Sequence, residues 1–307
     1  FNNYCQWRIY FVKREYKTNS EIRFYMVKSS QGLLWSFFGV LILSPDTLLI
    51  RLLNLTDFSL IFYRSFLPAV TIFLFLFWFY KRDTLKVFLL IGVPGIIYAT
   101  FYAITHICFV YSIQNTSVAN TLVIIAGAPI FAALFSIIFL KEKPSTFTWV
   151  IIFIAFVSMF IIGWGSYSSS GLFGDLMALT VAVFMGASGV LVRYFKKIDL
   201  VPACFIGCIL AGLYALPFDI EFSLTGVQIF YLSLMCFIML PIPFIIMTIA
   251  PKYTPAYQVY LIFLLESVLG TTWVWVIINE VPSLNTVIGG LLLLTSVLIY
   301  MILETRK

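Results

Sequence analysis

TPAYQVYLIFLLESVLGTTWVWVIINEVPS, at residues 254–283, resembles TSVANTLVIIAGAPIFAALFSIIFLKEKPS, at residues 116–145. An offset of 138 positions relates the two segments, and both are apolar runs that stop at Glu-x-Pro-Ser. The identical pairs at this offset are Thr116/Thr254, Ile124/Ile262, Glu142/Glu280, Pro144/Pro282, Ser145/Ser283 and Thr148/Thr286. If five helices separate the two copies, the copies cross a membrane in opposite directions. An inverted repeat within an apolar chain is typical of a secondary transporter rather than of an enzyme.

The composition is that of an integral membrane protein. Of the 307 residues, 62% are hydrophobic and only 10% are charged, and a soluble domain could not keep so much apolar surface away from water. Apolar runs of about 20 residues, the length that a helix needs to cross the hydrocarbon core, recur along the chain. The 32 Phe, 17 Tyr and 7 Trp residues fit helices that face lipid, with aromatic rings at the interfaces.

These runs predict an all-α integral membrane fold with ten transmembrane helices in a 5+5 inverted repeat. The expected helices span residues 31–53, 58–80, 86–113, 117–140, 147–164, 172–194, 200–217, 226–250, 254–278 and 284–303. Residues 1–30 are expected to form a cytoplasmic tail, residues 31–165 the first five-helix repeat, and residues 166–307 the second five-helix repeat. Residues 1–25 are polar and basic and lack the apolar core of a signal peptide, so we interpret them as a dispensable tail or an upstream extension before Met26.

The placement of the basic residues predicts the orientation of the chain. With the N-terminus in the cytoplasm, eleven Lys and Arg residues fall in internal loops or at the C-terminus, and only Arg51 falls at the outer ends. The internal residues are Lys81, Arg82, Lys86, Lys141, Lys143, Arg193, Lys196, Lys197, Lys252, Arg306 and Lys307. The outer loops instead carry Asp57, Asp219, Glu221 and Glu280. This pattern predicts a multi-pass protein of the inner or plasma membrane with both termini in the cytoplasm, and it accounts for the net charge of +6 without a nucleic-acid partner.

The chain resembles the drug/metabolite transporter superfamily in its ten-helix, EamA-domain form, over about residues 31–304. The resemblance rests on the paired segments above, on LLESVLGTTWVWVIINEVPSLNTVIGGLLLLTSVLIY, on SPDTLLIRLL and on FYRSFL. It implies a 5+5 inverted repeat and the export or exchange of small metabolites. One departure is Ser267, which stands where a proline often follows the glutamate of the ninth helix, as Pro129 stands in the fourth helix. A break in the ninth helix that depends on proline is therefore not expected.

Five ionisable residues stand out in the predicted helices, where each requires a partner or a function. One of them, Arg51, lies at the outer end of the first helix, and we interpret it as extending to the outer headgroups. Asp46, Arg64 and His106 are expected at a similar depth in the outer half of the membrane, and Glu266 near the middle of the ninth helix. Asp46, His106 or Glu266 could carry a coupling proton or act in gating, and Arg64 could attract a substrate carboxylate. The alternatives are a structural ion pair between Asp46 and Arg64, and an interhelical hydrogen bond for His106.

Further polar residues suggest a substrate site. Tyr98, Tyr102 and His106 repeat every four residues and share one face of the third helix. Asn120 and Gln258 are equivalent at the 138-residue offset, so we expect them to form a polar pair at the midplane. The hypothesis is a central cavity lined by helices 1, 3, 4, 6, 8 and 9, in which these tyrosines and amides bind the substrate. The alternative for Tyr98 and Tyr102 is core packing.

Glycines and prolines indicate where helices are interrupted and where they pack closely. GVPG at residues 92–95 and PIP at residues 241–243 weaken the backbone ladder in corresponding helices of the two halves. Such interruptions either border the substrate path or are static kinks. GASG at residues 186–189 and the pair Gly289 and Gly290 predict close helix packing.

The sequence therefore predicts a secondary active transporter, not an enzyme, that works by alternating access around a midplane cavity. The expected cargo is a small organic metabolite such as an amino acid, exported with a coupling proton or by exchange. The expected partners are this substrate and the lipid bilayer, with a homodimer as a candidate assembly. A nucleotide-sugar or drug carrier is the first rival, although a nucleotide calls for several cavity cations and only Arg64 is well placed. The second rival, a membrane enzyme or a scaffold, lacks support, because the five Cys residues have no metal-ligand spacing and neither a nucleophile–base pair nor a phosphate loop is present.

Overall fold

The computed structural model describes residues 29–116, 118–164, 171–279 and 284–305, and these residues form helices joined by short turns. In this described part, eight helices are long and apolar enough to cross a membrane. Two shorter apolar helices, Thr146–Ile162 and Val201–Ala215, accompany them. The N-terminal tail up to residue 28, Glu280, Arg306 and Lys307 lie outside the described residues. The chain is thus an all-helical membrane protein, as its composition predicts.

The helices follow the predicted apolar runs closely, but several runs are divided. The first half contains α2 Ser29–Leu43, α3 Asp46–Leu53, α4 Asp57–Tyr80, α5 Thr84–Leu90, α6 Gly92–Asn115, α7 Val118–Ile125, α8 Ala128–Phe135 and α9 Thr146–Trp164. The second half contains α10 Leu172–Tyr194, α11 Val201–Ala215, α12 Gly226–Leu234, α13 Pro241–Ile249, α14 Ala256–Phe263, α15 Leu265–Ile278 and α16 Leu284–Thr305. π-Helical turns at Ser136–Leu140 and Met235–Met239 extend α8 and α12.

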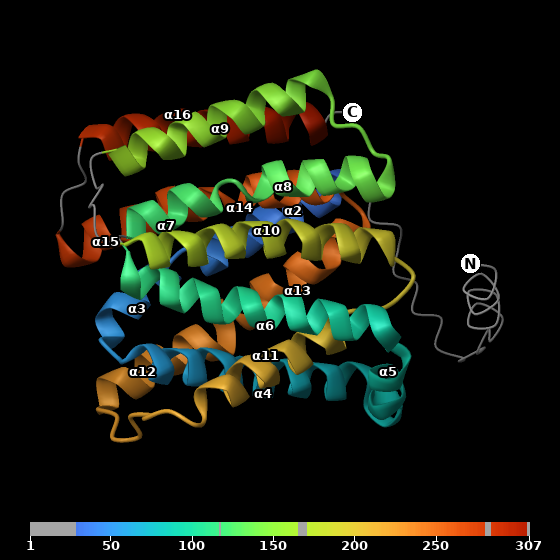
Figure 1. Ribbon diagram of the computed structural model, residues 1–307, viewed down its shortest axis with the longest axis vertical. Helices are drawn as coiled ribbons and strands as arrows, with labels where there is room; N and C mark the ends of the chain where they lie inside the picture. The colour runs from blue at the N-terminus through green and yellow to red at the C-terminus, as the bar shows by residue number, and fades with distance from the viewer. Residues whose placement is uncertain (1–28, 117, 165–170, 280–283, 306–307) are drawn as a thin grey trace.

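The helices lie roughly parallel to one axis and form a layered bundle (Figure 1). α9 and α16 pack together along one edge, and α4 and α11 pack together along the opposite edge. Between these edges, α10 packs against α6 and α8, and α8 in turn packs against α14. Helices from the two halves of the sequence are therefore interleaved, and the interior of the bundle is built by both.

The two copies of the sequence repeat break at equivalent positions. α7 ends at Ile125 and α14 ends at Phe263, which are equivalent at the 138-residue offset. The two helices run in opposite directions (Figure 1). The single helix predicted over residues 254–278 is divided into α14 and α15, and the break does not depend on a proline, in line with Ser267 at that position. The Oγ atom of Ser267 donates a hydrogen bond to the Leu264 carbonyl at 2.7 Å, and hydroxyl bonds of this kind bend helices.

Glycine and proline interrupt the helices where the sequence predicts, with one correction to the helix bounds. The expected single helix over residues 86–113 is wrong at its start, because the chain breaks between α5 and α6. Gly92 has a φ of +55°, a left-handed conformation that glycine adopts without strain. Pro45 separates α2 from α3, and α13 begins at Pro241. Proline fits these positions because it donates no backbone hydrogen bond.

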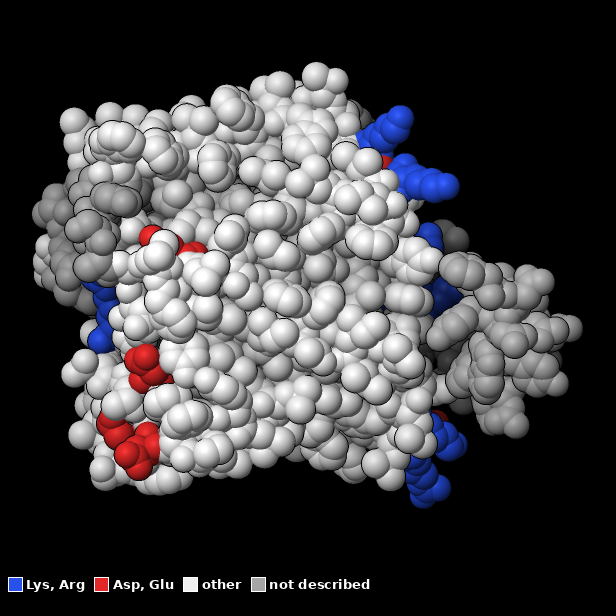
Figure 2. Space-filling model, viewed as in Figure 1, with Lys and Arg blue, Asp and Glu red and all other residues white. Residues whose placement is uncertain are grey.

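Charged side chains gather at the two ends of the bundle. Figure 2 shows an apolar flank, with most Lys and Arg side chains at one end and acidic side chains clustered toward the other. The apolar flank is consistent with contact to lipid acyl chains. We call the end that carries Lys81, Lys141, Lys196 and Lys252 the basic end.

The predicted glycine contacts are confirmed. A Cβ atom added to Gly186 would lie 2.7 Å from the backbone nitrogen of Ala132, and one added to Gly289 would lie 2.6 Å from the carbonyl oxygen of Ser158. These distances are too short for a side chain, so α10 packs directly on α8 and α16 directly on α9. Small residues allow helices in a membrane to approach in this way.

This packing predicts different effects of alanine at two adjacent glycines. Gly289→Ala should lower the midpoint of thermal unfolding in detergent, because overpacking costs about 1–3 kcal/mol. Gly290→Ala is the matched control, since its Cβ would lie 3.5 Å from Val268, an ordinary contact. Equal midpoints for the two variants would contradict the direct contact between α9 and α16.

Candidate functional site

A cavity of about 130 Å³ lies inside the bundle. One water molecule needs roughly 10–15 Å³ of such space, so the cavity can hold a cluster of waters or a small organic molecule. Six of the eight predicted site residues line the cavity: Asp46, Arg64, Tyr98, Tyr102, His106 and Glu266. The six helices expected to line it all contribute, and α4 and α9 add Arg64 and Met159. The cavity thus lies between helices from both halves of the sequence.

A buried ion pair occupies one end of this cavity. The Nη1 atom of Arg64 donates to Oδ1 of Asp46 at 2.5 Å, and the two residues are only 4% and 1% exposed. The break at Pro45 places Asp46 at the start of α3, while Arg64 comes from the middle of α4. The guanidinium also lies 5.4 Å from the ring centroid of Phe109. The pair proposed as the structural alternative therefore exists, and it also faces the cavity.

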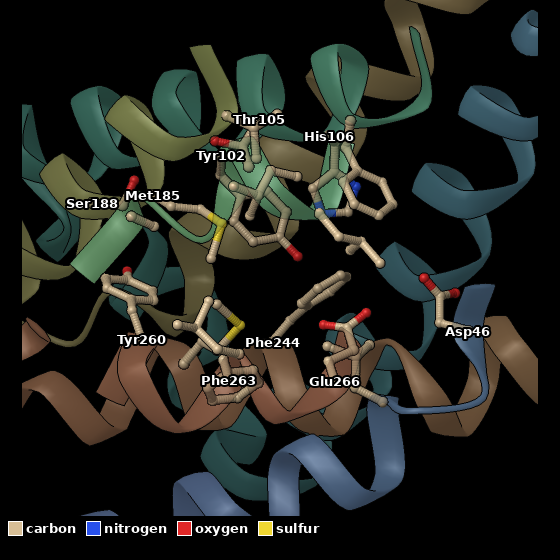
Figure 3. A pocket seen from close by; sticks show the side chains of 18 of the residues that line it. Asp46, Tyr102, Thr105, His106, Met185, Ser188, Phe244, Tyr260, Phe263 and Glu266 are labelled. Carbon is tan, nitrogen blue, oxygen red and sulfur yellow. The ribbon is translucent and has the colours of Figure 1, made fainter. Parts of the chain in front are cut away.

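Glu266 and His106 lie in the same polar region as the ion pair. Figure 3 shows the Glu266 carboxyl group across the cavity from His106 and beside Asp46. The break before α15 places Glu266 in the first turn of that helix. His106 stacks on Tyr102, with ring centroids 4.4 Å apart, and meets Phe244 edge-on. Among the hydrogen bonds of the described residues, none involves His106, so its contacts are aromatic and the alternative of an interhelical hydrogen bond is not seen.

The tyrosines form a wall that leads from this polar region toward the basic end. The hydroxyl groups of Tyr98 and Thr248 share a hydrogen bond of 2.9 Å, which joins α6 to α13. The Sγ atom of Cys208 donates weakly to the Tyr102 hydroxyl at 3.8 Å. Both tyrosines are buried and line the cavity, so they pack in the core and also present polar atoms near the cavity. Tyr260 faces the same space from α14 (Figure 3).

The expected midplane pair of Asn120 and Gln258 is not present. Asn120 lies at the start of α7, where its Nδ2 atom donates to Thr116 Oγ1 at 3.4 Å. Gln258 lies at the start of α14, where its Nε2 atom donates to Glu304 Oε1 at 3.4 Å. Neither residue lines the cavity, and the two helix starts lie at opposite ends of the bundle (Figure 1). In an inverted repeat, the equivalent of a residue near one membrane face lies near the opposite face. Two residues that are equivalent at the 138-residue offset are therefore not necessarily close in space.

Equivalent residues do meet in the cavity where they lie at the helix breaks inside the two membrane spans, Asn120–Leu140 and Ala256–Ile277. Ala128 and Glu266 are equivalent at the offset, as are Ile125 and Phe263, and all four line the cavity. The repeat therefore contained the correct signal at the helix breaks, about eight residues after the amide pair. The apolar lining was not predicted from the sequence, and it comprises Phe109, Met159, Met185, Phe244, Met247 and Phe263 among others. In an apolar chain these residue types are too common to identify a site.

Polar contacts connect the two halves of the sequence at both ends of the bundle. At the basic end, the Nε atom of Arg193 lies 2.7 Å from both carboxylate oxygens of Glu142, and its Nη1 atom donates to the Pro251 carbonyl at 3.3 Å. At the other end, the Tyr63 hydroxyl donates to the Glu221 carbonyl at 2.8 Å. The cavity thus lies between two sets of contacts that bridge the halves.

The site offers no evident means of binding a metal ion. Within the described residues, no group of three or more His, Cys, Asp or Glu side chains is placed to bind one. Cys204 and Cys208 lie in the core, where Cys204 shares a hydrogen bond of 2.8 Å with Thr248. The chemistry available in the cavity is therefore charge pairing, hydrogen bonding, aromatic contact and proton exchange.

Comparison with known proteins identifies related transporters. An uncharacterized transporter of Helicobacter pylori strain J99 is 28% identical over 174 residues, which are 55% of this chain and 58% of that protein. The pseudopaline exporter CntI of Pseudomonas aeruginosa is 24% identical over 246 residues, which are 78% of this chain and 84% of that protein. The match to the Helicobacter protein thus spans little more than half of its length.

A solved structure shares the fold of this chain, and a family profile matches its sequence. A crystal structure of another protein aligns with a TM-score of 0.75 at 16% sequence identity, over 91% of this chain and 100% of that chain. The sequence profile of the EamA-like transporter family matches residues 30–164 and again residues 172–302. Because these two matches together cover most of the chain, the protein belongs to the EamA-like transporter family, as the resemblance to drug/metabolite transporters predicts.

Proposed function

We propose that this chain is a secondary active transporter of a small amphipathic metabolite, such as an amino acid, which it exports with a coupling proton or by exchange. The observation that carries the proposal is the cavity, in which Asp46, Arg64 and Glu266 face an otherwise apolar and aromatic space. A charged group on the substrate would meet the ion pair, and its apolar part would contact Phe244 and Phe263. Ionisable residues inside a membrane usually mark such substrate or proton paths.

The proposed architecture has ten crossings in two inverted five-helix repeats, at residues 31–165 and 166–307. Eight long apolar helices, two shorter ones and two family matches support it. The charge distribution in Figure 2 supports a cytoplasmic basic end and thus cytoplasmic termini in the cell membrane. Alternating access then requires the contacts at Arg193 and Glu142 to open in one state and those at Tyr63 and Glu221 to open in the other.

Coupling is proposed to arise from competition for Arg64. In the structure Asp46 neutralises the guanidinium, and both groups line the same cavity as Glu266. An incoming carboxylate would add a third negative charge around one cation, which favours protonation of a carboxyl group nearby. Glu266 is the proposed proton carrier because no ion pair is recorded for it among the described residues. His106 is the second candidate, since it faces the same space.

A hydrophobic drug is the alternative cargo, and the thioether and aromatic lining favours it. Met159, Met185 and Met247 line the cavity together with several aromatic rings, and flexible methionines suit promiscuous binding. A nucleotide-sugar remains less suitable, because Arg64 is the one cationic side chain in the described lining. The relative named as a pseudopaline exporter supports transport of a metabolite, without identifying the cargo of this chain.

A liposome assay tests the proposed function directly. The purified chain is reconstituted, and uptake of a panel of radiolabelled amino acids, organic acids and hydrophobic cations is measured with and without a pH gradient. We expect an amphipathic metabolite to accumulate only in liposomes that contain the protein. If no solute in a broad panel moves, the carrier proposal fails.

Removing the carboxyl group of Glu266 should uncouple transport from the proton. Glu266→Gln keeps the size of the side chain but cannot exchange a proton, so we expect the stimulation by a pH gradient to disappear while substrate exchange persists. Asp219→Asn is the control, because Asp219 is exposed and far from the cavity lining. Unchanged pH dependence in Glu266→Gln would assign this residue a structural role.

The Asp46–Arg64 ion pair should be required for transport itself, and not only for the stability of the fold. Asp46→Asn leaves Arg64 buried without its counter-charge, and breaking a buried pair in this way costs about 3–5 kcal/mol. The double variant Asp46→Leu/Arg64→Met removes both charges and should recover much of the thermal stability. We expect this folded double variant to transport less than about a tenth of the wild-type amount. Wild-type transport by the double variant would show that the pair is structural only.

A further inference from the structure

A second pocket, of about 280 Å³, opens at the basic end of the bundle, away from the central cavity. It lies between the end of α4, the turn that joins α10 to α11, and the turn after α13. We call it the basic pocket, and its lining comprises Phe75, Leu76, Phe79, Tyr80, Lys196, Lys197, Asp199, Val201, Ile249, Lys252 and Tyr253. None of these residues lines the central cavity, so the proposed transport function does not explain this pocket.

The basic pocket carries an excess of positive charge. Three ammonium groups, those of Lys196, Lys197 and Lys252, face one carboxylate, that of Asp199. This carboxylate is already engaged, because Tyr80 donates a hydrogen bond to Oδ2, and the Val201 amide and Lys252 both donate to Oδ1. Lys196 and Lys197 are exposed, and no ion pair is recorded for either within the described residues. Two lysines are thus available to an anionic ligand.

The mouth of the pocket is apolar on the side of α4. Phe75 and Phe79 are 37% and 36% exposed, lie one turn apart and stack with ring centroids 5.9 Å apart. The same turns of α4 also expose Leu74, Phe77 and Trp78, so this side of the pocket continues into the surface that faces acyl chains. A soluble anion would gain nothing from these rings. A ligand with an anionic head and an attached hydrocarbon chain uses both parts of the pocket.

We propose that the basic pocket binds an acidic phospholipid of the leaflet at the basic end. The phosphate lies between Lys196 and Lys197, and an acyl chain follows Phe75 and Phe79 along α4. Basic pockets between transmembrane helices bind the headgroups of acidic lipids in this manner. The site joins the end of α4 to the segments after α10 and α13, so its occupant ties together elements that also pack around the central cavity.

Lipid titration of the purified full-length chain tests this proposal without any transport assay. The probes are phosphatidylglycerol, phosphatidylcholine with the same acyl chains, and glycerol 3-phosphate. Native mass spectrometry measures binding, and the midpoint of thermal unfolding measures stabilisation. We expect phosphatidylglycerol to bind more tightly than phosphatidylcholine and to raise the midpoint of thermal unfolding more. We expect glycerol 3-phosphate to bind weakly and to leave the midpoint unchanged.

Charge-neutralising variants locate the effect. Lys196→Gln/Lys197→Gln should weaken phosphatidylglycerol binding by at least about tenfold, because each lysine near a membrane surface contributes about a fivefold factor in affinity. Lys141→Gln/Lys143→Gln removes the same charge from two exposed lysines at the same end and should bind as the wild type does. Equal loss in both variants would overturn the pocket in favour of general surface charge. If glycerol 3-phosphate bound as tightly as phosphatidylglycerol, the ligand would be a soluble organophosphate and the lipid proposal would be overturned.

Discussion

The hydrocarbon core of a membrane offers no water, so every charge and every broken backbone turn inside it must be satisfied by the protein itself. The Asp46–Arg64 pair is the clearest consequence of this constraint here. Asp46 starts α3 directly after a proline break, and Arg64 reaches it from α4 at 2.5 Å. Breaks between α7 and α8 and between α14 and α15 lie around the same cavity. Irregular backbone and buried charge are thus concentrated where the two halves of the sequence meet.

This concentration relates the fold to transport. Close glycine contacts join helices from the two halves of the sequence, since Gly186 of α10 packs on α8 and Gly289 of α16 packs on α9. Polar contacts at the two ends of the bundle, such as that of Arg193 with Glu142, bridge the halves as well. Opening such polar contacts at one end or the other would give access to a central site. Bound substrate would favour one state only through contacts that differ between the two states.

Much of the fold could be predicted from the sequence, because apolar runs, prolines and the 138-residue repeat are strong local signals. The ends of α7 and α14 coincide at that offset, and the expected lining helices all reach the cavity. The site was only partly predictable. Charged residues such as Asp46 and Glu266 stand out in an apolar chain, whereas lining residues such as Phe244 do not. The Asn120 and Gln258 prediction failed for a geometric reason, since an inverted repeat brings together only those equivalent residues that lie near the middle of the membrane, here at the helix breaks.

Cysteine accessibility tests most directly whether one cavity opens to each face of the membrane in turn. Thr105→Cys places a thiol in the cavity lining, in a chain whose native cysteines are replaced by alanine. Thr100→Cys on the exposed face of the same helix serves as the control. A membrane-impermeant thiol reagent is applied to sealed vesicles of each orientation. Alternating access predicts that Thr105→Cys is labelled from both faces of the membrane, while Thr100→Cys is labelled from neither face. Labelling of Thr105→Cys from one face only, or from neither face, would contradict alternating access.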